Sequence, residues 1–472
     1  MTKTAMCDFN LNEPKNVYFI GIGGISMSGL AELLLSRHFA VSGSDMKRSP
    51  LTERLESLGA VISYDQSVSH ITDDTDLVVY TAAVHDGNPD LDDAKKRGIT
   101  VLSRAELLGL VMKTYECPIA VSGTHGKTTT TSMISEILLA ADTDPTLSIG
   151  GILPSIGGNF RIGKGTQFVT EACEYTNSFL HFFPRIGIIL NIDADHLDFF
   201  KDLSDIRHSF HEFAALIPDD GLLIINGDIP NLHKFTAGLK CKIITTGHDE
   251  SSDYYAKDIV LDENAHATYT VMRGTDDAGR RCHVGVPGLH NVYNSLAAIA
   301  LADHLGIDSD ITLKTISCFR GSKRRFEYKG DVQTSDKTGT FHVYDDYAHH
   351  PTEIRATIDT ALKVPHNELW VIFQPHTYTR TKALMGDFAE ALAPADHVIL
   401  TDIYAARETD DLGISSATLM KLIRSKRTSC HHISDFHDIE KFVLQNCTKN
   451  DMLITMGAGD VVNIGESLIK KT

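Results

Sequence analysis

Short apolar runs alternate with amphipathic stretches along the whole chain. From residue 16 to about 114, the strand-like runs NVYFIGI, AVSGSD, DLVVYTAAV and ITVLS alternate with stretches of helical apolar spacing, SMSGLAELLLSRH, SPLTERLESLG, NPDLDDAKKRG and RAELLGLVMKT. A short apolar run is typical of a buried strand, whereas apolar residues three and four positions apart are typical of one helix face. Alternation of the two predicts βαβ units and a parallel sheet.

The alternation continues in two further segments. The second opens with the strand CPIAVSG and the helix KTTTTSMISEILLAA, passes through QFVTEA, RIGIILNI, GLLIING and a β-rich stretch near 254–287, and ends with a helix at 291–306. The third begins near residue 323 and alternates strands and helices again. We therefore predict an α/β protein with three domains in series, at residues 1–115, 116–322 and 323–472.

Length and composition agree with this organisation. A chain of 472 residues favours about three domains, and 42% apolar with 22% charged residues is typical of a folded protein. The formal net charge of −18 argues against nucleic acid or an anionic membrane as a partner. We expect small-molecule substrates instead.

Three further features predict a cytoplasmic protein. No apolar run reaches the roughly 20 residues that a membrane span needs. The N-terminal stretch MTKTAMCDFNLNEPK has no apolar signal core. The eight cysteines are scattered without a C-x-x-C pair, which is typical of reduced thiols.

The glycine-rich stretch GIGGISMSG at 21–29 follows a predicted strand and opens a predicted helix. In that context backbone N–H groups and the helix dipole bind a phosphate group. Asp45 ends the next strand, where a ribose-binding carboxylate is expected, but Ser26 replaces the third glycine of the dinucleotide fingerprint. A nucleotide-phosphate site, for NAD or for a UDP-sugar, and a plain tight turn both remain open at this point.

A second glycine loop, GTHGKTTTT, lies between the strand PIAVS and an amphipathic helix. Only Thr124 and His125 separate Gly123 from Gly126, so the loop is shorter than the usual phosphate loop. Lys127 can reach the β- and γ-phosphates and the Thr128 hydroxyl can bind magnesium. The loop predicts a nucleoside triphosphate and Mg²⁺ as ligands.

Charged and histidine residues follow several later strands. Since parallel strands end at one edge of a sheet, these side chains are expected near the loop, where carboxylates can bind magnesium and cations can stabilise phosphoryl transfer. A capping or solvent-exposed role is the alternative for each residue alone. The residues are Glu171, Glu174, Asp193, Asp195, His196 and Asp198, then Arg324 and Arg325, the group DDYAHHPTE at 345–353, and Arg380.

The motifs GIGGISMSGLAELL, GTHGKTTTT, NIDADHLD, HNVYNSLAA, GSKRRFEYKG, DDYAHHPTEI, FQPHTYTRT and DIYAARE stand in this order along nearly the whole chain. In this series the chain resembles the Mur ligases of bacterial cell-wall synthesis. The resemblance implies an N-terminal Rossmann-like UDP-sugar domain, a central P-loop ATPase-like domain and a C-terminal Rossmann-like domain. It also implies an ATP- and Mg²⁺-dependent ligase that joins L-alanine to the lactyl carboxylate of UDP-N-acetylmuramate through an acyl phosphate.

The resemblance further implies roles for individual residues. Lys127, Glu171, His196, His349 and Arg380 are expected to act in catalysis, and Thr128, Glu171 and His196 to bind metal. The residues expected to bind ATP are Gly123, Thr124, His125, Gly126, Lys127, Thr128, Thr129, His290, Asn291, Asn294, Arg325 and Asp346, and those expected to bind the UDP-sugar are Gly21, Gly23, Gly24 and Asp45.

The sequence departs from the family pattern at three places. Cys173 lies in EACEYT where the family pattern is EADESD, and Thr377 stands where many relatives carry arginine. No counterpart of the carbamylated lysine of sister ligases is evident, and Arg207 and His208 occupy that segment.

Three alternatives to this ligase remain open. They are a nicotinamide-dependent dehydrogenase, a non-catalytic UDP-sugar-binding relative, and a sister ligase that attaches a recycled tripeptide or D-glutamate. The choice of alanine over glycine or serine stays open, because one methyl group contributes only about 1–3 kcal/mol in a pocket.

Overall fold

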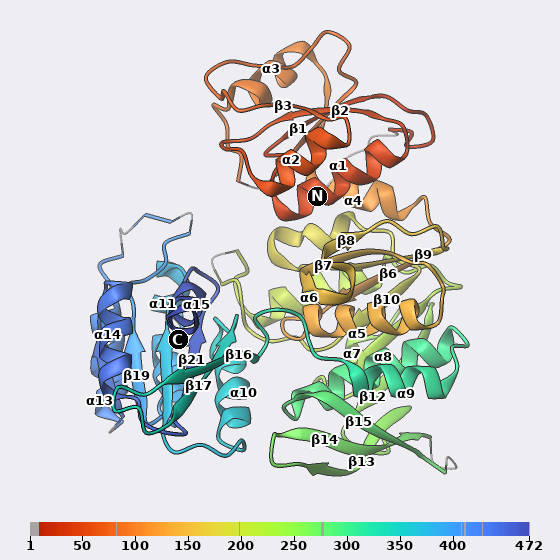
Figure 1. The fold of residues 1–472 in the computed structure, drawn as a ribbon. Coiled ribbons are helices and arrows are strands. Elements are labelled where there is room, and N and C mark those ends of the chain that lie inside the picture. Colours follow the sequence, from red (N-terminus) through yellow and green to blue (C-terminus); the bar gives the residue numbers. More distant parts are fainter. Residues whose placement is uncertain are drawn as a thin grey trace.

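The computed structural model describes residues 9–81, 83–197, 199–274, 278–406, 408–409, 412–426 and 428–471. These residues form three β-sheets with helices packed on them (Figure 1). The first sheet lies above the ten-stranded second sheet in this view, and the third lies to its side. The predicted α/β fold class is confirmed, and the structure has three sheets.

The first sheet has five parallel strands in the order β3-β2-β1-β4-β5. Each predicted strand and helix of this part is present, and the helix ends follow the sequence signals: Ser49 caps α2, and Asn88 begins and Gly98 ends α3. The strands are β1 Asn16–Ile20, β2 Ala40–Ser44, β3 Val61–Ser63, β4 Leu77–Tyr80 and β5 Thr100–Ser103; the helices are α1 Ile25–Ser36, α2 Pro50–Ser57, α3 Pro89–Arg97 and α4 Arg104–Met112.

The second sheet has the order β15-β14-β13-β12-β11-β10-β6-β9-β7-β8. Its centre is parallel and its two ends, β13–β15 and β7–β8, are antiparallel. The strands are β6 Cys117–Ser122, β7 Thr146–Leu153, β8 Gly158–Arg161, β9 Gln167–Glu171, β10 Ile186–Ile189, β11 Leu222–Asn226, β12 Lys242–Gly247, β13 Tyr254–Leu261, β14 His266–Arg273 and β15 Arg280–Pro287; the helices are α5 Lys127–Ala140, α6 Leu203–Ala214, α7 Leu232–Phe235, α8 His290–His304 and α9 Ser309–Cys318, with the 3-10 helices η1 Pro154–Ile156 and η2 Tyr175–His181.

The third sheet has the order β16-β17-β21-β18-β19-β20, and β16 is its antiparallel edge strand. The stretch TKALMGDFAEALA has the apolar spacing of one helix, but the structure divides it in two, because Leu384 leaves helical geometry at φ −112° and ψ 19°. The strands are β16 Glu327–Gln333, β17 Thr340–Asp346, β18 Leu369–Phe373, β19 His397–Leu400, β20 Ser429–His432 and β21 Met452–Met456; the helices are α10 Pro351–Ala361, α11 Tyr378–Ala383, α12 Met385–Leu392, α13 Ser416–Ser425, α14 Phe436–Asn446 and α15 Val462–Lys470.

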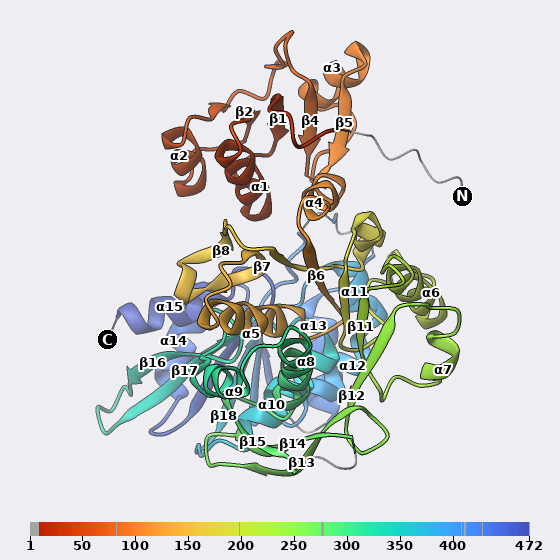
Figure 2. The same ribbon diagram turned by 90° about the vertical axis from the view of Figure 1, so that its right-hand side faces the viewer.

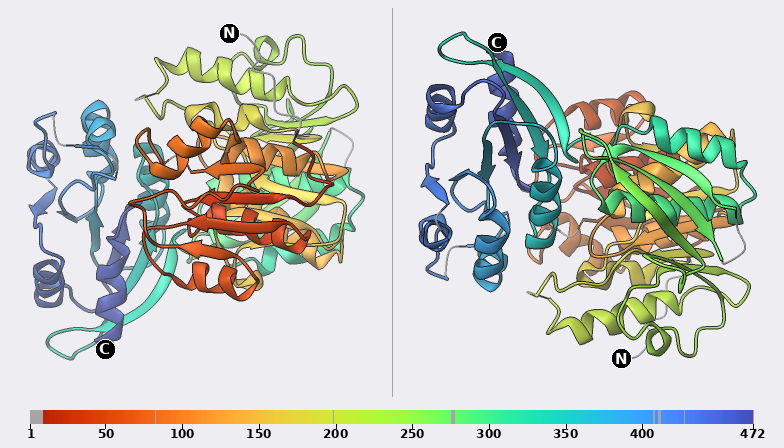
Figure 3. Two further views of the ribbon diagram at one scale, coloured as in Figure 1. Left: turned by 90° about the horizontal axis from the view of Figure 1, so that it is seen from above. Right: turned by 90° about the horizontal axis from the view of Figure 1, so that it is seen from below.

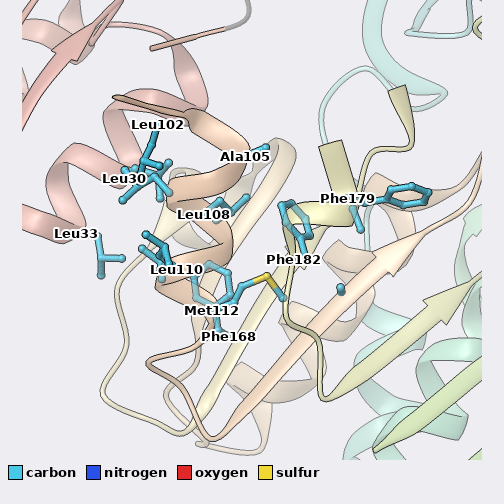
Figure 4. Close-up of a cluster of buried hydrophobic side chains, with 14 of the residues drawn as sticks. Leu30, Leu33, Leu102, Ala105, Leu108, Leu110, Met112, Phe168, Phe179 and Phe182 are labelled. Carbon is cyan, nitrogen blue, oxygen red and sulfur yellow. The ribbon is translucent and has the colours of Figure 1, made fainter. Parts of the chain in front are cut away.

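One hydrophobic cluster joins the first sheet to the second. Helix α4 descends from β5 towards the start of β6 (Figure 2), and Leu108 and Met112 on it belong to the same buried cluster as Phe168, Phe179 and Phe182 below (Figure 4). The helix lies so close to η2 that a Cβ atom at Gly109 would overlap the carbonyl oxygen of His181. The two sheets therefore share a core.

The third sheet packs beside the second without joining that cluster. Its buried residues form two separate clusters, one on each face of the sheet. Seen from above and below, the C-terminal part lies to one side of the other two (Figure 3). Within the described residues, every helix is too short or too polar to cross a bilayer.

Candidate active site

The predicted phosphate loop connects β6 to α5. Gly123 has φ +141°, and Gly126 has φ +84° and is the N-cap of α5. Both values lie in the left-handed region that favours glycine. A Cβ at Gly126 would lie 2.6 Å from Oδ1 of Asn294, so the loop is also tightly covered by α8. The spacing of the two glycines is therefore a requirement of the backbone.

Lys127 bonds to its own loop and to a buried carboxylate. Its Nζ lies 2.5 Å from the carbonyl oxygen of Gly123 and 3.0 Å from Oε2 of Glu174. Desolvation lowers the pKa of Lys127, but the charge of Glu174 outweighs it and the pKa is raised. The lysine is therefore a fixed cation at the start of α5.

Thr128 and Glu171 lie together, as the metal prediction requires. The Thr128 hydroxyl donates to Oε2 of Glu171 at 3.1 Å, and the Gly150 N–H donates to Oε1 at 2.5 Å. Nη2 of Arg325, from the third part of the chain, lies 3.3 Å from the Thr128 Oγ1. A hydroxyl and a carboxylate are the oxygen ligands that Mg²⁺ prefers, so this pair fits that ion.

His196 lies beside the second carboxylate of the same segment. Its Nε2 is 3.9 Å from Oε1 of Glu174, and its ring stacks on Tyr175 with centroids 4.6 Å apart. Desolvation lowers the pKa of His196, which keeps the imidazole neutral and able to act as a ligand. An imidazole suits Mg²⁺ less well than oxygen does, so His196 fits the ion less closely than Thr128 and Glu171.

A cavity of about 970 Å³ lies between the second and third sheets. It is within the size range of small-molecule sites. Among its polar lining residues is Asn294, whose side-chain amide donates to Oδ1 of Asn291 at 2.9 Å. The predicted ATP-binding residues that line it are His125, Gly126, Thr129, His290, Asn291, Asn294, Arg325 and Asp346; Gly123, Thr124, Lys127 and Thr128 belong to the adjoining loop but not to the lining.

Asp346 is a buried carboxylate at the end of β17. It accepts hydrogen bonds from the backbone N–H groups of Phe326 at 2.8 Å and Ala348 at 2.7 Å. Desolvation raises its pKa to about 6 in spite of nearby Arg325. By contrast, Arg324 bonds to Asp345 at 3.0 Å and to the carbonyl oxygens of Gly457 and Gly459, and so holds the third sheet together.

Arg380 and His349 lie near each other at the edge of the third sheet. Arg380 Nε is 3.2 Å from Oδ1 of Asp195, and its Nη1 is 3.2 Å from Nδ1 of His376. The His376 ring meets the His349 ring edge-on at 5.7 Å. Desolvation lowers the pKa of His349 and of His376 to about 4, so both imidazoles are neutral near pH 7 and can accept a proton.

The first glycine loop lies apart from this cluster. Gly21 has φ +79°, and the Gly23 N–H donates to Oδ2 of Asp45 at 2.7 Å. Gly24 is the N-cap of α1, so the loop does open a helix as predicted. Among the described residues, Gly21, Gly23, Gly24 and Asp45 do not line the cavity between the second and third sheets.

The residues that depart from the family pattern lie in the following local environments. Desolvation raises the pKa of the Cys173 thiol to about 11. Thr377 has φ +63°, and its hydroxyl caps α11. Arg207 donates to the carbonyl oxygen of Pro230 at 2.8 Å, and His208 is exposed on α6. Asp198 lies outside the described residues.

Sequence reasoning gave no individual role to two residues of this cluster. Glu353 lies in the first turn of α10, in contact with His349 and His125. His376 contacts Arg380. Their signals were weak. Glu353 stands at the third position of a helix that begins after His350, from where a carboxylate can reach back to the N–H groups before the helix. His376 belongs to the same FQPHTYTRT motif as Arg380.

Three family descriptions match successive parts of the chain. They are "Mur ligase family, catalytic domain" at residues 16–116, "Mur ligase middle domain" at 121–302 and "Mur ligase, glutamate ligase domain" at 324–459. The chain is also similar to the UDP-N-acetylmuramate–L-alanine ligase of Lachnospira eligens, with 55% identity over 469 residues, which covers 98% of this chain and 100% of the relative.

Two solved structures are similar over almost the whole length. UDP-N-acetylmuramate–alanine ligase from Thermotoga maritima has a TM-score of 0.78 and 30% identity, and the match covers 97% of this chain and 99% of that one. A murein peptide ligase from Psychrobacter arcticus has a TM-score of 0.70 and 29% identity, with 97% and 98% covered.

Proposed function

The chain belongs to the Mur ligase family, and on that premise we propose that it joins L-alanine to the lactyl carboxylate of UDP-N-acetylmuramate with ATP as the energy source. The observation that carries the proposal is the full-length similarity to an alanine ligase at 55% identity. The reaction is the first peptide step in the synthesis of the peptidoglycan precursor.

The chemistry explains why a phosphate loop is needed. A free carboxylate is a poor acyl donor, because an oxide ion is a very poor leaving group. Transfer of the γ-phosphoryl group of ATP to the carboxylate gives an acyl phosphate, the amine of alanine attacks its carbonyl carbon, and inorganic phosphate leaves. Both steps build negative charge on oxygen atoms, which fixed cations stabilise.

Lys127 and Arg325 supply such cations at the two sides of the phosphate loop. Lys127 would bind the β- and γ-phosphates after exchanging its contacts with the loop carbonyls for phosphate oxygens. Arg325 already lies 3.3 Å from Thr128 and would bind the transferred group. Thr128, Glu171 and His196 would hold Mg²⁺, which would neutralise charge on the phosphates.

His349 and Arg380 would serve the amino acid. Alanine must attack as a neutral amine, and the neutral His349 imidazole would accept the proton that the nitrogen loses once it has bonded to the acyl carbon. Arg380, held by Asp195, would orient the α-carboxylate beside His376. With Thr377 in place of arginine, Arg380 is the cation that remains in this motif.

The first glycine loop would hold the UDP-sugar. Gly21, Gly23 and Gly24 precede α1, whose N-terminus attracts a diphosphate. Asp45, which already fixes the loop through Gly23, would bind a ribose hydroxyl. The family matches do not favour a nicotinamide-dependent dehydrogenase, since residues 16–116, which contain the first glycine loop, match the Mur ligase family.

The test is phosphate release by the purified protein. Release is expected only when UDP-N-acetylmuramate, L-alanine, ATP and Mg²⁺ are all present. Lys127→Ala should abolish it, whereas Lys257→Ala, at an exposed position on β13, should not. Full activity of Lys127→Ala would overturn the role of the loop.

The second candidate function is that of a murein peptide ligase, and the structural similarity to such a ligase, with a TM-score of 0.70, supports it. A tripeptide offered in place of alanine separates the two proposals. Faster turnover of the tripeptide would favour the rival. Competition among alanine, glycine and serine in the same assay would establish the preferred amino acid.

We assign the protein to the cytoplasm on the basis of its scattered free cysteines and its proposed use of ATP. Fractionation of cells with an antibody against the chain tests this assignment.

A further inference from the structure

The second and third parts of the chain meet along a short polar seam. The Thr352 hydroxyl donates to Oδ2 of Asp193 at 2.8 Å, and Nε2 of His350 lies 3.0 Å from the carbonyl oxygen of Ala194. Arg380 bonds to Asp195 two residues further on. The segment after β10 is therefore held against the first turn of α10.

His125 lies at the centre of this seam although it belongs to the phosphate loop. Its backbone N–H donates to Oδ1 of Asn191 at 2.8 Å. Its ring is 15% exposed, with Nε2 3.4 Å from Oδ2 of Asp193 and Nδ1 3.4 Å from Oε1 of Glu353. One imidazole thus bridges a carboxylate of the second part and a carboxylate of the third.

The bridge is an imidazolium. Carboxylates only accept, so both ring nitrogens of His125 must carry a proton. Desolvation lowers the pKa of His125, but Asp193 and Glu353 outweigh it and raise the pKa to about 9. The pKa of Asp193 is lowered, with the hydrogen bond from His125 as the largest cause. Burial raises the pKa of Glu353, but His349 and His125 together outweigh it and the pKa is lowered.

The ligand atoms of this cluster that could bind a metal ion already have protein partners. Ligand atoms of His125, Asp193 and His350 lie within 4.8 Å of one another. Each imidazole nitrogen of the two histidines already faces a protein partner, since His350 Nε2 meets Ala194 and its Nδ1 accepts from the N–H of Thr352 at 3.3 Å. A metal ion would have to displace these bonds.

Glu353 extends the bridge to the reacting centre. Its Oε1 faces His125, and its Oε2 accepts from the His349 N–H at 3.1 Å and lies 3.3 Å from His349 Nδ1. One carboxylate therefore connects the phosphate loop with the residue that would accept the amine proton. Because Glu353 contacts both His125 and His349, a shift of one histidine changes the position of the other.

We propose that His125 is a positioning residue which, through Glu353, couples the occupied phosphate loop to the placement of His349 and to docking of α10. The inference rests on the proposed function, because His349 matters only if an amine attacks. ATP phosphates bound in the loop would restrict the position of the His125 side chain. His125 in that position contacts Glu353 on the other side of the seam. By linkage, docking of α10 would in turn favour a loop that holds ATP.

Steady-state kinetics of His125→Gln and Glu353→Gln test the coupling. Each variant should lower kcat for amide formation by about 10- to 100-fold, the loss expected when a reacting group is misplaced by about 1 Å. The KM for ATP should change much less than kcat, because Lys127 and the loop glycines remain. The double variant should be no slower than the slower single variant, since both changes break one connection. His208→Gln, on the exposed face of α6, is the matched control.

Hydrogen–deuterium exchange distinguishes coupling from a purely structural role of His125. A purely structural role would not change which segments ATP protects. In the wild type, ATP with Mg²⁺ should slow exchange both in α5 and in residues 347–357. In His125→Gln the protection of α5 should remain and that of 347–357 should be lost. Should His125→Gln fail to fold, Glu353→Gln provides the same comparison.

Unchanged kcat in either folded variant, multiplicative losses in the double variant, or intact protection of 347–357 would overturn the coupling. Absence of phosphate release by the wild type would instead overturn the proposed function, so the two failures are distinguishable.

Discussion

At the scale of single residues, the site contains titratable groups whose pKa values are moved in opposite directions by the same cause. Desolvation lowers the pKa of His349 to about 4 and raises that of Asp346 to about 6. Both shifts favour the uncharged form. The two residues stand three positions apart, so one short segment holds a neutral base and a carboxylate that gains a proton easily.

His349→Ala is expected to lower kcat by about 10²- to 10⁴-fold, the usual contribution of a positioned base. Because the pKa of His349 is about 4, kcat/KM for alanine should show no loss from its protonation between pH 5 and 8. Initial rates across that range, with thermal unfolding of the variant as the control for folding, check the prediction. A rate within twofold of the wild type would exclude His349 as the base.

At the residue scale, local features could be predicted from the sequence, but contacts between distant residues could not. The loop glycines, Lys127 and Thr128 could be predicted because their spacing is a local requirement of the backbone. The bond between Lys127 and Glu174 could not be predicted, because these residues are 47 positions apart in the sequence. They meet because β6 and β9 are neighbours in the sheet.

At the scale of elements, helix α4 depends on a glycine for its close approach to η2. Gly109 has ordinary helical geometry, so its absence of a side chain, and not its backbone freedom, is what the contact requires. The neighbouring Leu108 and Met112 then reach the phenylalanines below (Figure 4).

Gly109→Ala should destabilise the protein by about 1–3 kcal/mol, the range found for overpacked cores. Gly386→Ala, on α12 with open space around its Cβ position, is the matched control and should be neutral or slightly stabilising. Chemical denaturation of both variants measures the difference. Equal stabilities would show that η2 moves aside without cost.

The seam beside α10 is expected to be sensitive to acid. The hydrogen bond from His125 lowers the pKa of Asp193; burial raises that of Asp195, but the charge of Arg380 outweighs it and the pKa is lowered. A lowered carboxylate pKa gives stability that is present above the unfolded value of about 4 and is lost as pH falls below it.

The melting temperature of the wild type should therefore fall between pH 5 and 3 more steeply than that of Asp193→Asn, which has no carboxylate to protonate at this position. Differential scanning calorimetry in matched buffers measures the two slopes. Parallel slopes would contradict a stabilising role for the Asp193 carboxylate.

The element scale was the most predictable from sequence. The strands and helices of the first sheet follow apolar runs and caps that act within a few residues, such as Ser49 and Asn88. The hairpin of β7 and β8 escaped prediction, because glycines interrupt its apolar pattern and its pairing is decided by β9. The split after α11 was also missed, since Leu384 is compatible with a continuous helix.

At the scale of the whole molecule, the two proposed nucleotide sites belong to different parts of the chain. The cavity is lined by residues of the second and third parts, whereas the first glycine loop lies on the first sheet (Figure 1). Sequence could place both loops at helix starts. The cavity itself, closed by the pairing of α10 with the segment after β10, is a property of the assembled fold.

ATP with Mg²⁺ should slow hydrogen exchange in residues 123–129, 290–294 and 346–353 and leave 21–45 unchanged. UDP-N-acetylmuramate alone should give protection at 21–45. Each ligand at about 100 times its Kd should also stabilise the protein by about 2.7 kcal/mol. Protection of 21–45 by ATP alone would show that the two sites are not separate.

The shared core of the first and second sheets has a consequence for synthesis of the chain on the ribosome. The apolar face of α4 is complete at Met112, but Phe179 on η2 and Phe210 and Phe213 on α6, which belong to the same cluster, come roughly 70 to 100 residues later. At about 5–20 residues per second the nascent N-terminal sheet waits for several seconds with that face uncovered. An apolar face that stays uncovered for this long is a surface to which a chaperone can bind during translation.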